Sequence, residues 1–169
     1  MVKLLGILAL SLLLSVNVYA SENEFPLDSN ITYGKLENGF TYYIRENQTP
    51  KDKVSIKLII KAGSIMEEEN QLGLAHLLEH MAFNGSKNFP KKKIDKYMSS
   101  IGLNLGSHYN ASVSFLKTSY DYEIPTKNDD DVEIALKILT DISKNLSLEP
   151  EAFESERKIV EEEWRTVIG

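Results

Sequence analysis

The chain has 169 residues and no cysteine, with 25 acidic residues against 19 basic ones and a formal net charge of −6. This acidic balance argues against a nucleic-acid-binding protein. The absence of cysteine excludes a disulfide-stabilised domain and a lipoprotein anchored through a modified cysteine, so a hydrophobic core must stabilise what is by length one domain.

The first twenty residues predict a secretory signal peptide. They contain one lysine, an apolar stretch over residues 4–16, and a short segment ending at Ala20 before the sequence turns polar. Cleavage after Ala20 would leave an exported protein with no stable membrane association, and an uncleaved N-terminal anchor is the alternative. We expect residues 21–30 to be a linker and residues 31–169 to be the folded domain.

Three strands are predicted at the start of this domain. Residues 31–37 and 40–46 flank Asn38-Gly39, a dipeptide that supplies the two positive φ angles of a tight hairpin turn. Residues 53–61 partly alternate and are rich in β-branched side chains, which indicates a third strand.

The middle of the chain predicts two helices and a strand. Residues 71–84 have apolar side chains at helical spacing. Pro90 can open a second helix that runs to Ile101 and is closed by Gly102. Residues 110–124 are dominated by small, aromatic and β-branched residues, and they predict one long strand returning to the sheet.

Two more helices complete the pattern. Asn128 caps an amphipathic helix, whose apolar face is expected to contain Val132, Leu136, Leu139 and Leu146. Pro150 opens a last helix that reaches at least Trp164. This order of elements favours an α+β fold, a two-layer sandwich of a mostly antiparallel sheet with helices on one face.

The segment His76-Leu-Leu-Glu-His80 contains two of the three histidines of the chain. On a helix, residues four apart lie about 6 Å apart along the axis, so both imidazoles can reach one metal ion. Glu79 projects near the same edge, where it can face metal-bound water without being a ligand. The His-x-x-Glu-His pattern uses its glutamate as a general base. Hydrogen-bonded core histidines are the alternative interpretation.

A catalytic zinc ion usually has three protein ligands, so a third is expected. Asn84 is a weak ligand, and His108 lies in a glycine-flanked loop where a turn role explains it equally well. The last helix offers Glu154, Glu156, Glu161, Glu162 and Glu163. Glu156 and Glu163 are two turns apart and share a face, so one could bind metal while the other supports a histidine. Spacing alone does not choose among the five.

Three separated segments resemble the insulinase and pitrilysin family of zinc metallopeptidases, and most closely its large periplasmic members. These segments are residues 73–85, Asn110-Ala111 and residues 156–165, and residues 35–43 resemble the start of the family's first domain. The likeness covers nearly all of residues 31–165.

The resemblance implies a role for each matching residue. His76, His80 and Glu163 would bind Zn²⁺, with one ion in the site. Glu79 would be the catalytic general base. Glu156 would be an acidic partner outside the ligand set. The implied location is the periplasm.

The resemblance also implies a peptide substrate and a partner. Asn110 and Ala111 match an edge-strand segment that holds the substrate backbone, although residues 112–117 depart from the family's usual continuation. Family enzymes use a second homologous domain or subunit that closes over the substrate. Because the sequence ends at Gly169, we expect an N-terminal fragment with an incomplete catalytic domain.

The implied activity is that of a zinc metalloendopeptidase acting on peptides or on small or unfolded proteins. Glu79 would take a proton from the attacking water and return it to the leaving amine. The alternative is a catalytically silent peptide-binding or structural half that needs a second homologous domain or subunit. The intact Glu79 favours the enzyme, whereas the short length favours the silent half for this polypeptide alone.

Overall fold

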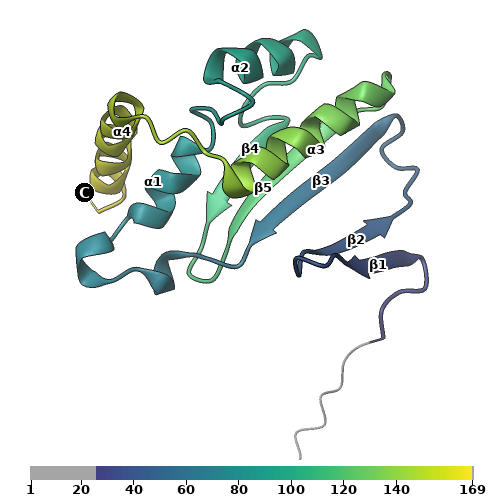
Figure 1. Ribbon diagram of the computed structural model, residues 1–169, viewed down its shortest axis with the longest axis horizontal. Helices are drawn as coiled ribbons and strands as arrows, with labels where there is room; N and C mark the ends of the chain where they lie inside the picture. Colours follow the sequence, from purple (N-terminus) through teal and green to yellow (C-terminus); the bar gives the residue numbers. More distant parts are fainter. Residues whose placement is uncertain (1–25, 169) are drawn as a thin grey trace, which may run out of the picture. The chain divides into compact units, whose positions relative to one another are not determined.

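The computed structural model describes residues 26–168 (Figure 1). The predicted signal peptide and the first half of the predicted linker lie outside the described residues. The chain divides between Asn47 and Gln48 into two compact units. None of the helices between residues 26 and 168 combines the length and the apolar character that a membrane crossing requires.

The first unit contains one antiparallel hairpin of β1 (Ile31–Lys35) and β2 (Thr41–Arg45), as predicted. The predicted two-residue turn is wrong. The strand β1 ends at Lys35 and β2 begins at Thr41, so the loop between them is longer. In this loop Gly39 alone has a positive φ, of 87°. The Asn38 carboxamide oxygen accepts a hydrogen bond from the Phe40 amide at 3.0 Å, so the asparagine side chain supports the turn without a positive φ of its own.

The second unit contains three strands and four α-helices with two short 3₁₀ helices. In chain order they are β3 (Lys53–Ile60), η1 (Ser64–Met66), η2 (Glu69–Gln71), α1 (Leu74–Met81), α2 (Lys91–Ser100), β4 (Tyr109–Val113), β5 (Thr118–Pro125), α3 (Asp129–Lys144) and α4 (Pro150–Ile168). The strands form an antiparallel sheet in the order β3-β5-β4.

The single strand predicted over residues 110–124 is wrong, because this segment forms the hairpin of β4 and β5. The Ser114 amide and hydroxyl both donate to the Lys117 carbonyl, at 2.9 and 3.1 Å, and close the turn. The turn also pairs with the chain after β3, where the Ile65 amide donates to the Phe115 carbonyl at 3.0 Å. Residues 114–117 contain no glycine, proline, asparagine or aspartate, so Ser114 is the one turn-favouring residue in this segment.

One face of the β3-β5-β4 sheet is buried beneath helices. In register, Leu58 lies beside Tyr120 and Ala111, and this face packs against α3 (Figure 1). The opposite face carries ion pairs, including Lys57 with Asp121 at 2.7 Å. The second unit is therefore an α+β two-layer arrangement with an antiparallel sheet, as predicted.

The apolar face predicted for α3 is confirmed at Leu139, which lies in the core, and at Val132 and Leu146, which pack against the core, but it is wrong at Leu136. The core residues of the helix are Ala135, Ile138, Leu139 and Ile142. Leu136 is 49% exposed, and Leu146 lies beyond the end of the helix. The spacing of the buried residues is i, i+3, i+4 and i+7, and Leu136 falls about 100° away from the start of that stripe.

Asp141 joins the end of α3 to the loop that follows α1. Its carboxylate accepts hydrogen bonds from the Ser86 hydroxyl at 2.8 Å, the Asn88 amide at 3.0 Å, and the side chains of Asn88 and Asn145 at 2.9 Å each. Burial by itself would raise the pKa of Asp141, but the hydrogen bonds from Asn145, Ser86 and Asn88 outweigh it and lower the pKa to about 2. The ionised carboxylate therefore holds the loop against α3.

Candidate metal centre

Helix α1 carries the histidine motif, and its N-terminus is capped by a residue outside the helix, Glu67. Gly73 has a φ of 88° and supplies no side chain to the helix N-terminus. The Glu67 carboxylate accepts hydrogen bonds from the Gly73 amide at 3.0 Å and from the Ala75 amide at 2.7 Å. The carboxylate also interacts favourably with the helix dipole. This cap explains why the helix begins later than the predicted residue 71.

The two motif histidines and one glutamate of α4 converge. The Nε2 atoms of His76 and His80 lie 3.2 Å apart, and Glu163 Oε2 lies 3.4 Å from the first and 3.5 Å from the second. Together they form a group that could hold a metal ion. Ligand atoms 2.0–2.2 Å from a tetrahedral zinc ion lie about 3.3–3.5 Å from one another, so this donor set fits zinc in both chemistry and spacing.

The packing of α4 beside α1 separates the five candidate glutamates (Figure 1). Glu154 and Glu161 pair with Arg157, and Glu162 pairs with Arg165 on the exposed side of the helix. Glu156 and Glu163 are the two that face the histidines. His108 is elsewhere, in a turn where its Nδ1 accepts a hydrogen bond from the Asn104 amide at 3.2 Å.

Glu156 contacts His80 on the side of the ring away from the cluster. Its Oε2 lies 3.1 Å from His80 Nδ1, and its side chain is only 13% exposed. Because a carboxylate accepts hydrogen bonds and does not donate them, Nδ1 must carry the proton. His80 Nε2 then presents its lone pair to the cluster, which is the orientation that a metal ligand needs.

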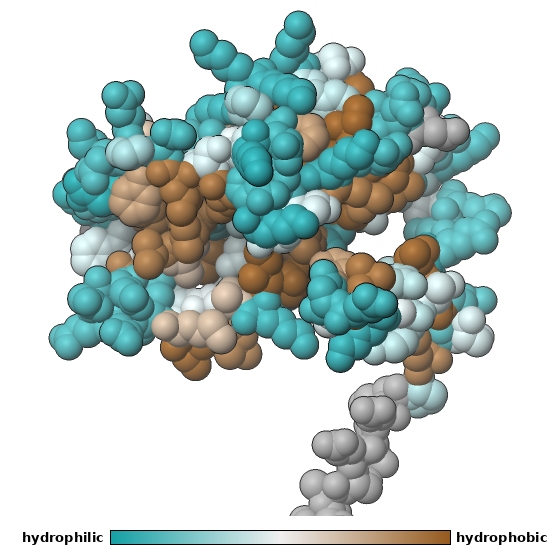
Figure 2. Space-filling view, in the orientation of Figure 1, coloured by the Kyte–Doolittle hydropathy of each residue, from teal (hydrophilic) through white to brown (hydrophobic). Residues whose placement is uncertain are grey.

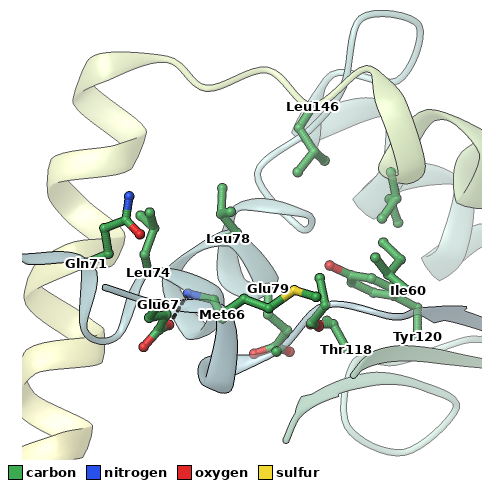
Figure 3. Close-up of a pocket in the computed structure, with 14 residues that line it drawn as sticks. Ile60, Met66, Glu67, Gln71, Leu74, Leu78, Glu79, Thr118, Tyr120 and Leu146 are labelled. Atoms are coloured by element: carbon green, nitrogen blue, oxygen red, sulfur yellow. Dashed lines mark hydrogen bonds between the residues drawn. The ribbon is translucent and has the colours of Figure 1, made fainter. Parts of the chain in front are cut away.

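Glu79 is buried beside the cluster, and its Oε2 lies 3.9 Å from His76 Nε2. It borders a pocket of about 260 Å³ whose lining is largely apolar, including Ile60, Leu78 and Leu146 (Figure 3). Hydrophobic surface is also gathered over α1 and toward α3 (Figure 2). Burial raises the pKa of Glu79, while the two histidines oppose that shift and Glu163 adds to it.

The apolar surroundings of Glu79 also shift the pKa of the neighbouring Tyr120. Burial, helped by the nearby Glu79 charge, raises the pKa of Tyr120 to about 12. The cluster itself is open on one side, since the His76 side chain is 40% exposed and that of Glu163 is 50% exposed. A buried carboxylate therefore lies next to a group of ligand atoms that solvent can reach.

Asn110 and Ala111 lie on β4, which is an edge strand of the three-stranded sheet. Ala111 is on the helix-covered face beside Tyr120, whereas Asn110 pairs with Asp121 on the opposite face. Helix α1 packs against β4, so the strand lies next to the element that carries the histidines.

Two polar residues near the cluster were not predicted to act together. The Asn84 side-chain nitrogen donates to Glu156 Oε1 at 2.8 Å, and Lys91 Nζ donates to Asn84 Oδ1 at 3.0 Å. From the sequence Asn84 was only a weak ligand candidate. No local signal could have joined it to a glutamate 72 residues away.

The family model described as Insulinase (Peptidase family M16) matches residues 42–168. The chain is 39% identical over 143 residues to "Probable zinc protease PqqL" of Haemophilus influenzae, a stretch that covers 85% of this chain and 15% of that protein.

Solved structures agree with this match. The crystal structure of the periplasmic protease PqqL from Escherichia coli has a TM-score of 0.79 at 37% identity, over 83% of this chain and 16% of that one. A mutant of the ferredoxin protease FusC, in complex with Arabidopsis ferredoxin, has a TM-score of 0.73 at 34% identity, over 82% of this chain and 15% of that one.

The chain thus spans about 15% of the length of the curated relative it matches. The similarity to PqqL-type members that the sequence motifs predicted is confirmed. Residues 42–168 carry the match, and they include all three motifs. This chain belongs to the insulinase family of peptidases.

Proposed function

We propose that the chain carries the metal-binding active site of a zinc-dependent endopeptidase that hydrolyses peptides or small or unfolded proteins. The observation that carries this proposal is the convergence of His76, His80 and Glu163 within 3.5 Å of one another, beside the buried carboxylate of Glu79. Membership of a family whose named relatives are zinc proteases supports the same reaction.

His76, His80 and Glu163 would hold the zinc ion. When bound in such a site, zinc lowers the pKa of a water molecule to about 7 and polarises a carbonyl group. Two neutral imidazoles and one carboxylate leave a net positive charge on the site. The exposed side, between His76 and Glu163, is where a substrate carbonyl would enter.

Glu79 would be the general base. Its carboxylate lies close to the ligand atoms without belonging to the group that could bind the ion. Burial raises its pKa, which makes the carboxylate a better proton acceptor near neutral pH. It would accept the proton of the attacking water and deliver that proton to the nitrogen of the leaving amine as the peptide bond breaks.

The substrate would be an extended peptide paired with the outer edge of β4, at Asn110 and Ala111. Backbone hydrogen bonds along a sheet edge hold a peptide with little demand on its sequence. A second homologous domain or subunit would cover the substrate from the other side. Since PqqL of Escherichia coli is described as periplasmic, we propose export to the periplasm for this protein too.

The direct test measures metal and cleavage separately. Zinc bound per chain is measured by elemental analysis after dialysis, and a mixture of unstructured peptides is incubated with the protein and analysed by mass spectrometry. We expect one zinc per chain, and new peptide termini when this chain is joined to a second homologous domain. In that polypeptide Glu79→Gln should retain the zinc and lose the cleavage. Zinc without cleavage would favour the catalytically silent half. A chain that binds no zinc would overturn the proposal.

A further inference from the structure

We propose that Asn84 is a positioning residue of the metal centre. Its carboxamide orients the Glu156 carboxylate, and through it the His80 imidazole, while Lys91 fixes which way the carboxamide points. This inference rests on the proposed zinc site and adds a specific set of contacts that would tune it.

The Asn84 carboxamide uses both of its ends. Its nitrogen donates to Glu156 Oε1 at 2.8 Å and lies 3.3 Å from the His80 carbonyl oxygen at the end of α1. Its oxygen accepts a hydrogen bond from Lys91 Nζ at 3.0 Å. A flipped carboxamide would turn its oxygen toward the carboxylate and its nitrogen toward the ammonium, so only one orientation satisfies all three partners.

Glu156 has one fixed donor for each of its oxygens. His80 Nδ1 lies at Oε2 and the Asn84 nitrogen lies at Oε1. A carboxylate that is only 13% exposed has little water to replace a lost donor. If Asn84 stops donating, Glu156 can rotate, and His80 then loses the group that fixes its tautomer and ring orientation.

These contacts connect three separate elements. Lys91 is the first residue of α2, Asn84 follows α1, and Glu156 and the candidate ligand Glu163 both belong to α4. The link from Asn84 to Glu156 therefore ties the helix that carries the histidines to the helix that carries Glu163. A change at Asn84 should affect the metal site even though both ends of its carboxamide are occupied by Glu156 and Lys91.

The informative change is Asn84→Asp, which keeps the size of the side chain and replaces a donor with an acceptor. An aspartate there would face the Glu156 carboxylate, and the repulsion should turn Glu156 away from His80. We expect zinc affinity to fall by about 10- to 100-fold, as for other partners that orient a metal ligand. Asn84→Ala removes the donor without adding charge, so its loss of zinc affinity should be about 10-fold or less.

Lys91→Met tests the outer end of the network. The lysine contact is exposed, so its loss should lower zinc affinity by about fivefold or less. Asn145→Ala is the matched control, because its side chain also donates to a carboxylate, that of Asp141, at 2.9 Å. It should lower thermal stability without changing zinc affinity.

Zinc dissociation constants of the full chain and its variants are measured by competition with a chromophoric chelator. The absorption spectrum of the Co²⁺-loaded protein reports the ligand geometry, and thermal unfolding of the metal-free protein reports folding. We expect weaker zinc binding and an altered Co²⁺ spectrum for Asn84→Asp and Asn84→Ala, and neither effect for Asn145→Ala. If Asn84→Asp does not fold, Asn84→Ala decides the result.

Two failures can be told apart. If the unmodified chain binds no zinc, the proposed function fails. If the unmodified chain binds zinc and the Asn84 variants bind it equally well with an unchanged Co²⁺ spectrum, the positioning role is overturned while the zinc site stands. Equal losses of zinc affinity in Asn84→Ala and Asn145→Ala would also overturn it, because they would indicate a general loss of stability.

Discussion

Glu156 Oε2 lies 3.1 Å from His80 Nδ1, and on the other side of the same ring His80 Nε2 lies 3.2 Å from His76 Nε2. One imidazole thus joins a carboxylate of α4 to the cluster of candidate ligands. This arrangement gives Glu156 and Glu163, which lie on one face of α4, different contacts at the same histidine pair.

Replacing Glu156 with alanine should weaken zinc binding while leaving the three candidate ligands in place. We expect the dissociation constant to rise by about 10- to 100-fold, because the tautomer of His80 is no longer fixed. Glu154→Ala is the control, since that carboxylate pairs with Arg157 on the exposed side of the same helix. Unchanged zinc affinity in Glu156→Ala would contradict the role inferred for this contact.

Glu163→Ala should impair zinc retention more than any other single glutamate change on α4. Loss of a ligand should exceed the effect of losing a supporting partner, so we expect a loss of about 100-fold or more. The comparison is Glu162→Ala, the next residue, whose side chain is 71% exposed and pairs with Arg165. Elemental analysis after dialysis measures the retained zinc, and equal zinc content in the two variants would reject Glu163 as the ligand.

Glu79→Gln should retain zinc and lose peptide cleavage. The amide keeps the shape of the side chain but cannot take a proton from water, so the rate should fall by about 10²- to 10⁴-fold. The assay needs a polypeptide that contains this chain and cleaves peptides, with zinc content measured on the same sample. Normal cleavage by the variant would refute the assignment of the base.

Asp141→Asn should destabilise the fold without affecting the metal site directly. The carboxylate accepts four hydrogen bonds, and we expect the free energy of unfolding at neutral pH to fall by about 2–3 kcal/mol. Urea unfolding of the metal-free protein measures this change. Glu133→Gln is the control, because that exposed residue pairs with Lys137 one helical turn away and its replacement should change stability much less than Asp141→Asn does.

The effect of Asp141 should also depend on pH. Its pKa is lowered to about 2 in the folded chain, against about 3.9 for an unperturbed aspartate. A lowered folded-state pKa means that the stabilisation is fully present above about pH 4 and is lost as the pH falls toward 2. The stability difference between the unmodified chain and Asp141→Asn should therefore shrink over that interval. A constant difference would show that the charge of Asp141 is not what stabilises the loop.

Features set by neighbouring residues were predictable from the sequence. The four-residue spacing of His76 and His80 places both imidazoles on one helix edge, whatever the rest of the fold does. Pro90 and Pro150 marked the start of two helices, and β-branched residues marked β3. The β1–β2 hairpin was also predicted, although its loop is longer than the two-residue turn expected from Asn38-Gly39.

Features that depend on contacts between distant segments of the chain were not predictable from the sequence. The turn at residues 114–117 has Ser114 as its one turn-favouring residue, and it also pairs with the chain after β3, which is distant in the sequence. On α3 only Leu136 was misplaced, because neighbouring rotations of an amphipathic helix bury different residues and the sheet beneath selects one of them.

The sequence by itself determined the histidine pair, the intervening Glu79, and a terminal helix with glutamates on one face, because helical periodicity is a local property of the backbone. Only the tertiary structure decided that Glu163 lies beside the Nε2 atoms of His76 and His80, and that Glu156 lies beside His80 Nδ1. The contacts of Asn84 with Glu156 and of Lys91 with Asn84 were likewise decided by the tertiary structure. Those contacts depend on how α4 packs against α1, and that packing is the sum of interactions between residues more than 70 positions apart.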